Sequence, residues 1–334
     1  MPTPQNTQIR LAKRPSGTPV PDDFSVVAEA ARPPSEGEVL VAVDFLSLDP
    51  AMRGWMNEGK SYIDPVGLGE VMRAIGVGHV VDSRAPDMAV GDHVVGLLGV
   101  QRYATVPARG LDKVDARLAP LPRYLSVLGM PGMTAYFGLL DVGRPKAGET
   151  VVVSGAAGAV GAVVGQIAKL KGCHVVGIAG GTEKCQYVVN ELGFDACIDY
   201  KASDLAKGLK AHCPNGIDVY FDNVGGDILD EVLRRINKGA RIVICGAISQ
   251  YNALEAVKGP ANYLALLVNR ARMEGFVVFD YRHRYGEAAR EMAGWLAAGK
   301  LKAREHIVEG LETFPERLLM LFRGENFGKL ILKP

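Results

Sequence analysis

The sequence predicts an α/β protein in which a barrel-like β domain precedes a doubly wound parallel sheet, and three observations lead to that prediction. An uncharged run of β-branched residues at 151–153 ends in small residues and is followed by a helical pattern up to Gly172. From about residue 130 to about residue 290, short apolar runs alternate with helical stretches. Before residue 125, frequent Gly, Pro and Asp separate short strands, and no long amphipathic helix is evident.

Residues 151–172 have the order strand, tight turn, helix, which places a phosphate at a helix N-terminus. Gly158 lets the backbone approach a pyrophosphate, and Gly161 and Gly165 let the helix pack close to the sheet. The motif reads A-x-G-x-x-G, and the absence of charge from 151 to 168 also suggests a membrane segment. The strand-like first half and the many Gly and Ala residues favour a dinucleotide-binding turn.

The residues after the second strand, 174–179, indicate which dinucleotide is bound. NAD-specific folds place a carboxylate at the end of this strand, where it accepts hydrogen bonds from the ribose 2′-OH. Here the position is occupied by Ala179-Gly180-Gly181-Thr182, and Lys184 follows nearby. Because no carboxylate is present to repel it, a 2′-phosphate can bind here, and Lys184 can neutralise its charge. Glu183, however, could turn toward a ribose. We therefore expect NADPH rather than NADH.

Composition excludes several functional classes. The 334 residues carry 38 basic and 37 acidic side chains, a net charge of +1, without a long block of one sign. Nothing therefore predicts a nucleic-acid-binding surface, and no secretory signal is evident at the N-terminus. The five cysteines fit no CxxC or finger spacing. An odd number of scattered cysteines is typical of reduced thiols in a cytoplasmic protein.

The strands expected in the first part are at 38–43, 76–81 and 92–96. Those expected in the parallel sheet are at 150–154, 174–179, 195–199, 217–222 and 241–245. A helix should run from Tyr285 to Ala298 and end at Gly299. A second should begin with a Thr313 cap followed by Pro315 and Glu316, and a last strand should cover 328–332.

Several segments spread along the chain resemble the medium-chain dehydrogenase/reductase superfamily. The resemblance is strongest to its zinc-independent prostaglandin reductase / leukotriene B4 12-hydroxydehydrogenase group, which includes plant alkenal double-bond reductases and bacterial curcumin reductase. The matching segments, in chain order, are 48–54, 131–136, 154–161, 221–226, 245–252, 274–276 and 326–329. The resemblance implies a GroES-like catalytic domain at 1–125, a Rossmann NADP-binding domain at 126–292 and a return to the catalytic domain at 293–334.

Zinc alcohol dehydrogenases of this superfamily carry a Cys, a Gly-His-Glu and a second Cys or Asp as catalytic ligands. The region expected to hold the Cys is Ser47–Pro50, the His-Glu pair falls on Ala74-Ile75, and the first part contains no cysteine. His79 and His93 fit structural roles better than ligation. We expect no metal, and without a Lewis acid the reduction of an activated C=C bond is favoured over that of a simple ketone.

The expected reaction is NADPH-dependent reduction of α,β-unsaturated ketones and aldehydes, with hydride transfer to the β carbon. The resemblance places two catalytic tyrosines at the active site, Tyr62 and Tyr251. A phenol is protonated at neutral pH and can donate a hydrogen bond to the developing enolate oxygen. The proton for the α carbon would come from a hydroxyl or from water. The alternatives are an NADPH:quinone oxidoreductase of the same superfamily and a non-catalytic NADPH-binding protein.

The resemblance also assigns cofactor contacts by position. The pyrophosphate should meet the 158–160 turn, the 2′-phosphate should meet Lys184 and Tyr200, and the remaining contacts lie toward the nicotinamide. The complete set of expected cofactor-binding residues is Gly158, Ala159, Val160, Lys184, Tyr200, Asn223, Ser249, Phe276 and Asn326. Membership of the group further implies a homodimer whose sheet continues across the interface near Phe276–Phe279, with a small enone or enal as the substrate and no membrane or nucleic-acid partner.

Overall fold

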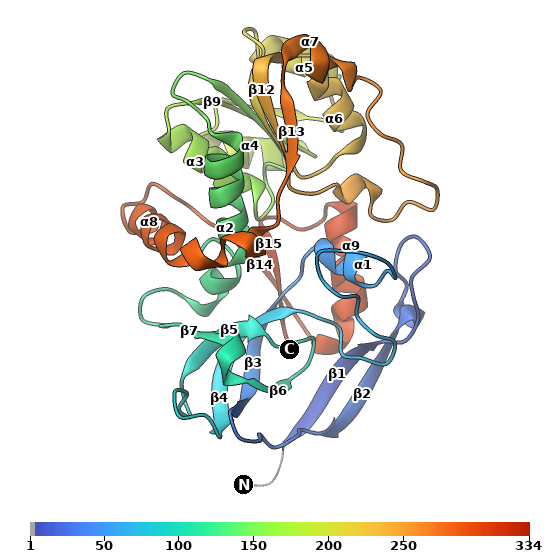
Figure 1. Cartoon of the computed structure of the whole chain (residues 1–334), viewed down its shortest axis with the longest axis vertical. Helices are drawn as coiled ribbons and strands as arrows, with labels where there is room; N and C mark the ends of the chain where they lie inside the picture. Colours follow the sequence, from blue (N-terminus) through green and yellow to red (C-terminus); the bar gives the residue numbers. More distant parts are fainter. Residues whose placement is uncertain (1–3) are drawn as a thin grey trace. The chain divides into compact units, whose positions relative to one another are not determined.

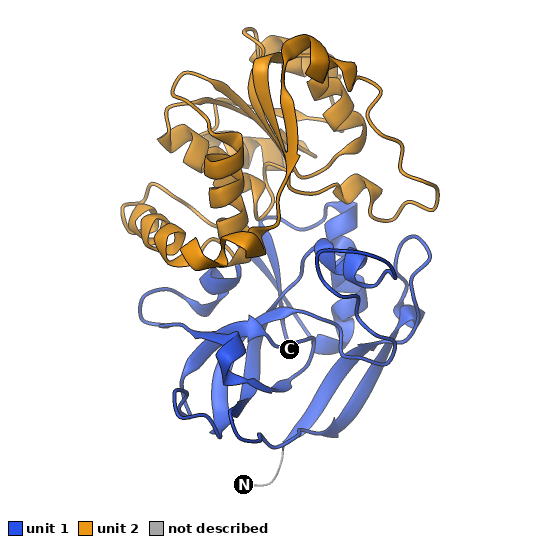
Figure 2. Ribbon diagram, viewed as in Figure 1, with its two compact units in different colours: residues 1–125, 305–334 blue, residues 126–304 orange. Residues whose placement is uncertain are grey.

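The computed structural model describes residues 4–334, which divide into two compact units (Figure 2). Of the described residues, unit 1 contains 4–125 and 305–334, and unit 2 contains 126–304. The sequence suggested a boundary at 292, whereas unit 2 extends to Arg304. Residues beyond 292 stay in unit 2 because they complete a helix and because the Lys302 backbone bonds the Gln166 side chain, through N–H (2.7 Å) and C=O (2.9 Å).

Unit 2 is built on a six-stranded parallel sheet (Figure 1). Its spatial order is β10 (Ala196–Asp199), β9 (His174–Ala179), β8 (Thr150–Ser154), β11 (Ile217–Asp222), β12 (Ile236–Ile244) and β13 (Arg272–Gly275). The order reverses between β8 and β11, so the carboxyl ends of these two strands form the switch point where open α/β sheets bind ligands. The predicted parallel strands are present, and β12 begins earlier than the predicted 241.

Helices cover both faces of this sheet, as the predicted doubly wound fold requires. Their bounds are α2 Met130–Phe137, α3 Gly161–Leu170, α4 Thr182–Asn190, α5 Leu205–His212, α6 Gly226–Leu233, α7 Leu264–Asn269 and α8 Tyr285–Ala297. On one face, α5 and α6 bury a cluster that includes Val152, Val176 and Tyr220. On the other face, α4 packs so closely that a Cβ on Gly177 would lie 3.0 Å from Val188.

Unit 1 contains a mixed sheet in the order β14 (Glu305–Glu309), β15 (Lys329–Lys333), β3 (Glu38–Ser47), β4 (Ile75–Ser83), β5 (His93–Leu97) and β7 (Leu111–Lys113), with β6 (Tyr103–Pro107) also paired to β3. Strands β1 (Gln5–Leu11) and β2 (Phe24–Ala30) form a separate hairpin. The helices are α1 (Ala51–Trp55) and α9 (Phe314–Arg323). The C-terminal strand β15 pairs antiparallel with β3, which joins the C-terminal segment to the first part of the chain in one sheet.

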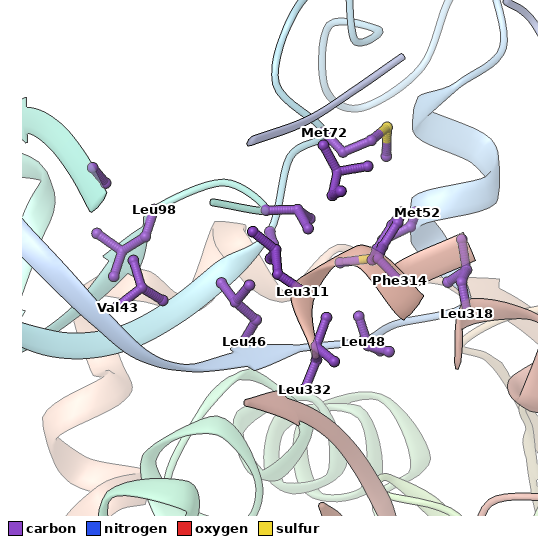
Figure 3. Close-up of a cluster of buried hydrophobic side chains, with 14 of the residues drawn as sticks. Val43, Leu46, Leu48, Met52, Met72, Leu98, Leu311, Phe314, Leu318 and Leu332 are labelled. Atoms are coloured by element: carbon purple, nitrogen blue, oxygen red, sulfur yellow. The ribbon is translucent and has the colours of Figure 1, made fainter. Parts of the chain in front are cut away.

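The core of unit 1 gathers apolar side chains from early and late segments (Figure 3). Leu46 of β3 lies opposite Leu332 of β15, and Val43 of β3 lies beside Leu98 in the same cluster. Phe314 and Leu318 of α9 also belong to this cluster. Complete burial of such side chains stabilises the unit by roughly 1.5–3 kcal/mol each. The C-terminal segment is therefore held in unit 1 by its own apolar residues.

Helix α9 begins where the sequence predicted, but the predicted cap is wrong. Thr313 makes no side-chain capping hydrogen bond to the helix. Its hydroxyl instead donates to the carbonyl oxygen of Gly310 over 2.7 Å. A 3-10 turn, Leu311–Thr313, leads directly into α9, so the hydroxyl is turned back toward the preceding carbonyls.

Candidate cofactor and active site

The turn between β8 and α3 has the close backbone approach that the sequence predicted. Gly155 adopts a φ of +62°, and its carbonyl oxygen accepts a hydrogen bond from the Gly158 N–H over 2.9 Å. A Cβ on Gly161 would lie 2.3 Å from that same oxygen, so only glycine fits at the first position of α3. Gly158, Ala159 and Val160 remain partly exposed at the helix N-terminus, where backbone N–H groups attract an anion.

Farther along α3, Gly165 also lies at a close contact. A Cβ there would lie 1.8 Å from the ring of Phe194, which is buried beside the start of β10. The missing side chain therefore lets α3 lie against this aromatic ring. The segment 151–168 thus forms a buried strand, a turn and a short helix, and among residues 4–334 none of the helices is long and apolar enough to cross a membrane.

Asn223 lies at the switch point, directly after β11. Its Nδ2 donates to the carbonyl oxygen of Ser154 over 2.7 Å, and its backbone N–H donates to Ser154 Oγ over 2.9 Å. These two hydrogen bonds tie the carboxyl ends of β8 and β11 together. Asn223 is partly buried at the edge where a ligand of this fold would lie.

Asp222 is a buried carboxylate that sequence reasoning did not single out. Its Oδ1 accepts hydrogen bonds from the Tyr220 hydroxyl (2.8 Å), the Ser154 hydroxyl (3.1 Å) and the backbone N–H groups of Val224 (3.0 Å) and Gly225 (2.8 Å). Burial raises the pKa of Asp222 despite these hydrogen bonds, each of which favours the ionised form. One oxygen atom thus fixes the turn that carries Asn223.

The loop 245–251 folds over this turn and brings two further predicted residues to Asn223. The Ser249 hydroxyl donates to the carbonyl oxygen of Val224 over 2.6 Å. The Tyr251 hydroxyl accepts a hydrogen bond from the Ala247 N–H over 3.2 Å. Gly246 lies between this hydroxyl and Asn223: a Cβ on Gly246 would be 2.9 Å from the hydroxyl and 3.6 Å from the Asn223 carbonyl oxygen. Asn223, Ser249 and Tyr251 therefore gather at one end of the sheet.

Tyr200 and Lys201 lie beside Gly180 at the end of β9, and Lys201, which the sequence analysis missed, is a neighbour of Lys184. A Cβ on Gly180 would lie 3.0 Å from both the Tyr200 ring and Lys201 Cε. Burial, and next the neighbouring Lys201 ammonium, lower the pKa of Lys184. Two neighbouring ammonium groups beside an exposed phenol could hold an anion.

Asp199 is a carboxylate at the same turn, where backbone N–H groups hold it in place. Its Oδ1 accepts the backbone N–H groups of Gly181 (2.8 Å) and Lys201 (3.1 Å). These backbone hydrogen bonds, that of Gly181 first, lower the pKa of Asp199. The carboxylate therefore fixes the Gly180-Gly181 turn, and the two glycines leave open the space beside Tyr200 and Lys201.

Phe276 directly follows β13 and packs edge-on against Phe221 of β11, with ring centroids 6.4 Å apart. Gly138 makes room for it, because a Cβ there would lie 2.4 Å from the Phe276 ring. The sequence analysis expected the sheet to continue across a dimer interface near residues 276–279. This segment lies past the end of β13, and Val278 begins a 3-10 helix. At this side of the sheet the edge strand is therefore β13, residues 272–275.

Tyr62 and Asn326 belong to unit 1, whereas the other nine predicted residues belong to unit 2. The Tyr62 hydroxyl accepts the indole N–H of Trp55 over 3.1 Å, while 54% of Tyr62 remains exposed. Asn326 Nδ2 donates to the Gly328 carbonyl oxygen over 2.9 Å, as a turn residue does. Each side chain is thus held by its own unit.

A buried ion pair occupies the region where metal-dependent relatives carry their cysteine ligand. Lys329 Nζ lies 2.6 Å from Asp49 Oδ1 and donates to the Leu48 carbonyl oxygen over 2.8 Å. Ser47 donates to the other oxygen of Asp49. Within residues 4–334 no three His, Cys, Asp or Glu side chains come together as a metal site.

Comparisons with known proteins agree with this arrangement. The family model for the N-terminal domain of oxidoreductases matches residues 7–114, and that for zinc-binding dehydrogenases matches residues 159–294. The chain is 46% identical to an NADPH-dependent curcumin reductase of Escherichia coli, with 98% of this chain and 97% of that protein covered. It is 42% identical to a 2-alkenal reductase (NADP(+)-dependent) of Nicotiana tabacum, with 98% and 97% covered.

Among solved structures, CurA of Vibrio vulnificus in complex with NADPH superimposes with a TM-score of 0.93 at 48% identity, covering 98% of both chains. The similarity extends over both units. The segments quoted from the sequence therefore reflect common ancestry and not an isolated motif. The chain belongs to the medium-chain dehydrogenase/reductase superfamily, in the group that contains the curcumin, alkenal and prostaglandin reductases.

Proposed function

We propose that this protein is an NADPH-dependent oxidoreductase that reduces the C=C bond of α,β-unsaturated ketones and aldehydes. The observation that carries the proposal is nearly full-length similarity, above 40% identity, to reductases named for curcumin and 2-alkenals. Both substrate classes contain a C=C bond conjugated to a carbonyl group. Unit 2 would bind the nucleotide, and unit 1 would be the GroES-like catalytic domain.

The residues of unit 2 suit the cofactor. The Gly155–Gly161 turn is a cradle that a Cβ would fill, and Gly158, Ala159 and Val160 are placed to meet the pyrophosphate. Lys184 and Tyr200, with Lys201, would hold the 2′-phosphate. Asn223, Ser249 and Phe276 would contact the nicotinamide half, and Asn326 is the remaining proposed cofactor-binding residue.

When bound, NADPH supplies the hydride that adds to the β carbon of the substrate. The protein must then stabilise the negative charge that develops on the carbonyl oxygen, and a phenol hydroxyl is the donor we assign to it. Tyr62 and Tyr251 are the candidates, because hydrogen bonds from Trp55 and Ala247 fix the positions of their oxygens. The α carbon receives its proton from a hydroxyl or from water.

We further propose a homodimer formed through unit 2. The free edge of β13 could pair with a second copy, and Leu264, Leu267 and Val268 of α7 are apolar side chains exposed beside β12. A Leu267→Lys variant should shift sedimentation toward the monomer if this face is buried. The five cysteines are all free thiols, which supports a reducing compartment such as the cytoplasm.

The function is tested by following NADPH oxidation with an enone, an enal, a quinone and a saturated ketone, and by identifying each product. We expect a saturated carbonyl compound from the enone and the enal, with the same rate after treatment with a chelator. Turnover with the quinone alone would favour the alternative, an NADPH:quinone oxidoreductase. Tight NADPH binding without turnover of any compound would leave a non-catalytic binder.

A further inference from the structure

Two cysteines in unit 2 lie in direct contact, and nothing in the proposed reaction uses them. Cys185 is in the first turn of α4, and Cys197 is in β10, the strand at the edge of the parallel sheet. Cys197 Sγ donates to Cys185 Sγ over 3.0 Å. Both residues are partly exposed.

The packing around the pair leaves space for two sulfur atoms. Cys197 is opposite Gly177 of β9 in the parallel register, and a Cβ on Gly177 would lie 3.3 Å from Cys197 Sγ. Two of the other three cysteines have different surroundings: Cys173 donates to the Lys146 carbonyl oxygen over 3.4 Å, and Cys213 is fully buried in a core cluster. Cys185 and Cys197 thus form a preassembled dithiol.

The pair is also adjacent to the residues proposed to hold the 2′-phosphate. Cys185 follows Lys184 on α4, and its N–H donates to the Gly181 carbonyl oxygen over 3.2 Å. Cys197 lies two residues before Asp199, whose carboxylate holds the N–H groups of Gly181 and Lys201. Any movement of α4 toward β10 therefore changes the spacing of the two lysines.

We propose that Cys185 and Cys197 form a reversible disulfide under oxidation, and that this disulfide weakens NADPH binding. The second part rests on the proposed function. Closing the gap to an S–S bond of about 2.05 Å draws the first turn of α4 toward β10. Lys184 moves with that turn, and the anion site loses the geometry in which both lysines reach one phosphate.

The chemistry needs a two-electron oxidant, which we take to be a peroxide in the cell and diamide in the test tube. The hydrogen bond from Cys197 favours the thiolate of Cys185, so Cys185 Sγ attacks the oxidant first. Cys197 Sγ then attacks the Cys185 adduct. Both S–H bonds break, one S–S bond forms, and two electrons and two protons pass to the oxidant. Peroxide becomes two waters, and diamide becomes the hydrazine.

Burial raises the pKa of both thiols. A large share of each is therefore protonated at neutral pH, and the pair should resist mild oxidants. The pair thus differs from a peroxide-consuming active site, and we expect it to respond to sustained oxidation rather than to turn over.

The test compares full-length protein before and after diamide, with a Cys185→Ala variant and a Cys213→Ala control. We expect the oxidised wild type and the control to lose two free thiols and to yield a Cys185–Cys197 cross-linked peptide by mass spectrometry. Their NADPH dissociation constant should rise roughly tenfold, the size expected for one charge-assisted hydrogen bond, and return with dithiothreitol. After the same diamide treatment, the Cys185→Ala variant should bind NADPH as tightly as the reduced protein does.

The outcomes are distinguishable. Absence of the cross-linked peptide in oxidised wild type would overturn the disulfide, and a disulfide with unchanged NADPH affinity would overturn its coupling to the phosphate site. If reduced protein fails to bind NADPH, the proposed function fails, while the peptide analysis still decides whether the disulfide forms. If Cys185→Ala folds poorly, Cys185→Ser serves in its place.

Discussion

Ser154 and Asn223 are joined by two hydrogen bonds, one to the Ser154 hydroxyl (2.9 Å) and one to its carbonyl oxygen (2.7 Å). The two residues end or follow adjacent parallel strands at the point where the strand order reverses. The same Ser154 hydroxyl donates to Asp222, so Ser154, Asp222 and Asn223 belong to one hydrogen-bond network. This network fixes the edge of the sheet at which we place the cofactor.

Asp222→Ala should destabilise the protein strongly. The substitution removes the shared acceptor, so the buried Tyr220 and Ser154 hydroxyls each lose a hydrogen bond. We expect the free energy of unfolding to fall by about 3 kcal/mol. Asp222→Asn keeps an oxygen acceptor and should cost much less. Urea denaturation of the three proteins measures this, and equal stability of wild type and the alanine variant would contradict it.

The difference in stability between wild type and Asp222→Asn should depend on pH. Since the folded-state pKa of Asp222 is raised, the folded protein holds this proton more tightly than the unfolded chain does. That contribution to stability is complete below the ordinary aspartate pKa and is lost as pH rises through the folded-state pKa. The stability of wild type relative to Asp222→Asn should therefore fall as pH rises through this window.

Gly161→Ala should damage the turn between β8 and α3. The new Cβ would meet the Gly155 carbonyl oxygen at 2.3 Å, and backbone atoms must move to relieve the contact. We expect a loss of about 1–3 kcal/mol in stability together with weaker NADPH binding. Gly294→Ala in α8 is the matched control, because a Cβ there meets no atom within 4 Å and alanine favours a helix.

Lys201→Ala should weaken NADPH binding by roughly tenfold, with little effect on NADH, because only NADPH carries the 2′-phosphate. Lys184→Ala should behave similarly. The Lys184 pKa should also rise in Lys201→Ala, since the Lys201 ammonium contributes to its depression. Fluorescence titration with both nucleotides gives the affinities, and an equal loss for NADPH and NADH would argue against a 2′-phosphate site.

Tyr62→Phe and Tyr251→Phe should each lower kcat/KM for an enone and leave NADPH affinity unchanged. For the tyrosine that reaches the carbonyl oxygen, we expect kcat/KM to fall at least tenfold. Tyr263→Phe is the control, because Tyr263 is an exposed tyrosine next to α7. Steady-state kinetics separate kcat from KM. A variant with wild-type kinetics would remove that tyrosine from the mechanism.

The sequence predicted the features that are local in the chain. The β-branched run of β8, the small residues after it and the glycines of α3 lie within one short segment, and each has a direct steric reason. The cap at Thr313 failed because the 3-10 turn before the helix cannot be read from a cap motif.

The features that the sequence did not predict join distant segments. Asp222 reaches Ser154 across 68 positions, and Cys185 meets Cys197 across 12, so their contacts depend on sheet order and helix packing. Lys201 became a candidate only when the fold placed it beside Gly180 and close to Lys184. Proximity of this kind is a property of the folded chain.

The most direct test of the central claim is the fate of the hydride. The protein is given NADPH carrying deuterium at the transferred position of C4 and an open-chain enone, and the product is examined by NMR and mass spectrometry. Our account predicts one deuterium on the β carbon of a saturated ketone. Deuterium on a carbinol carbon, with the C=C bond intact, would show carbonyl reduction instead and would contradict the account.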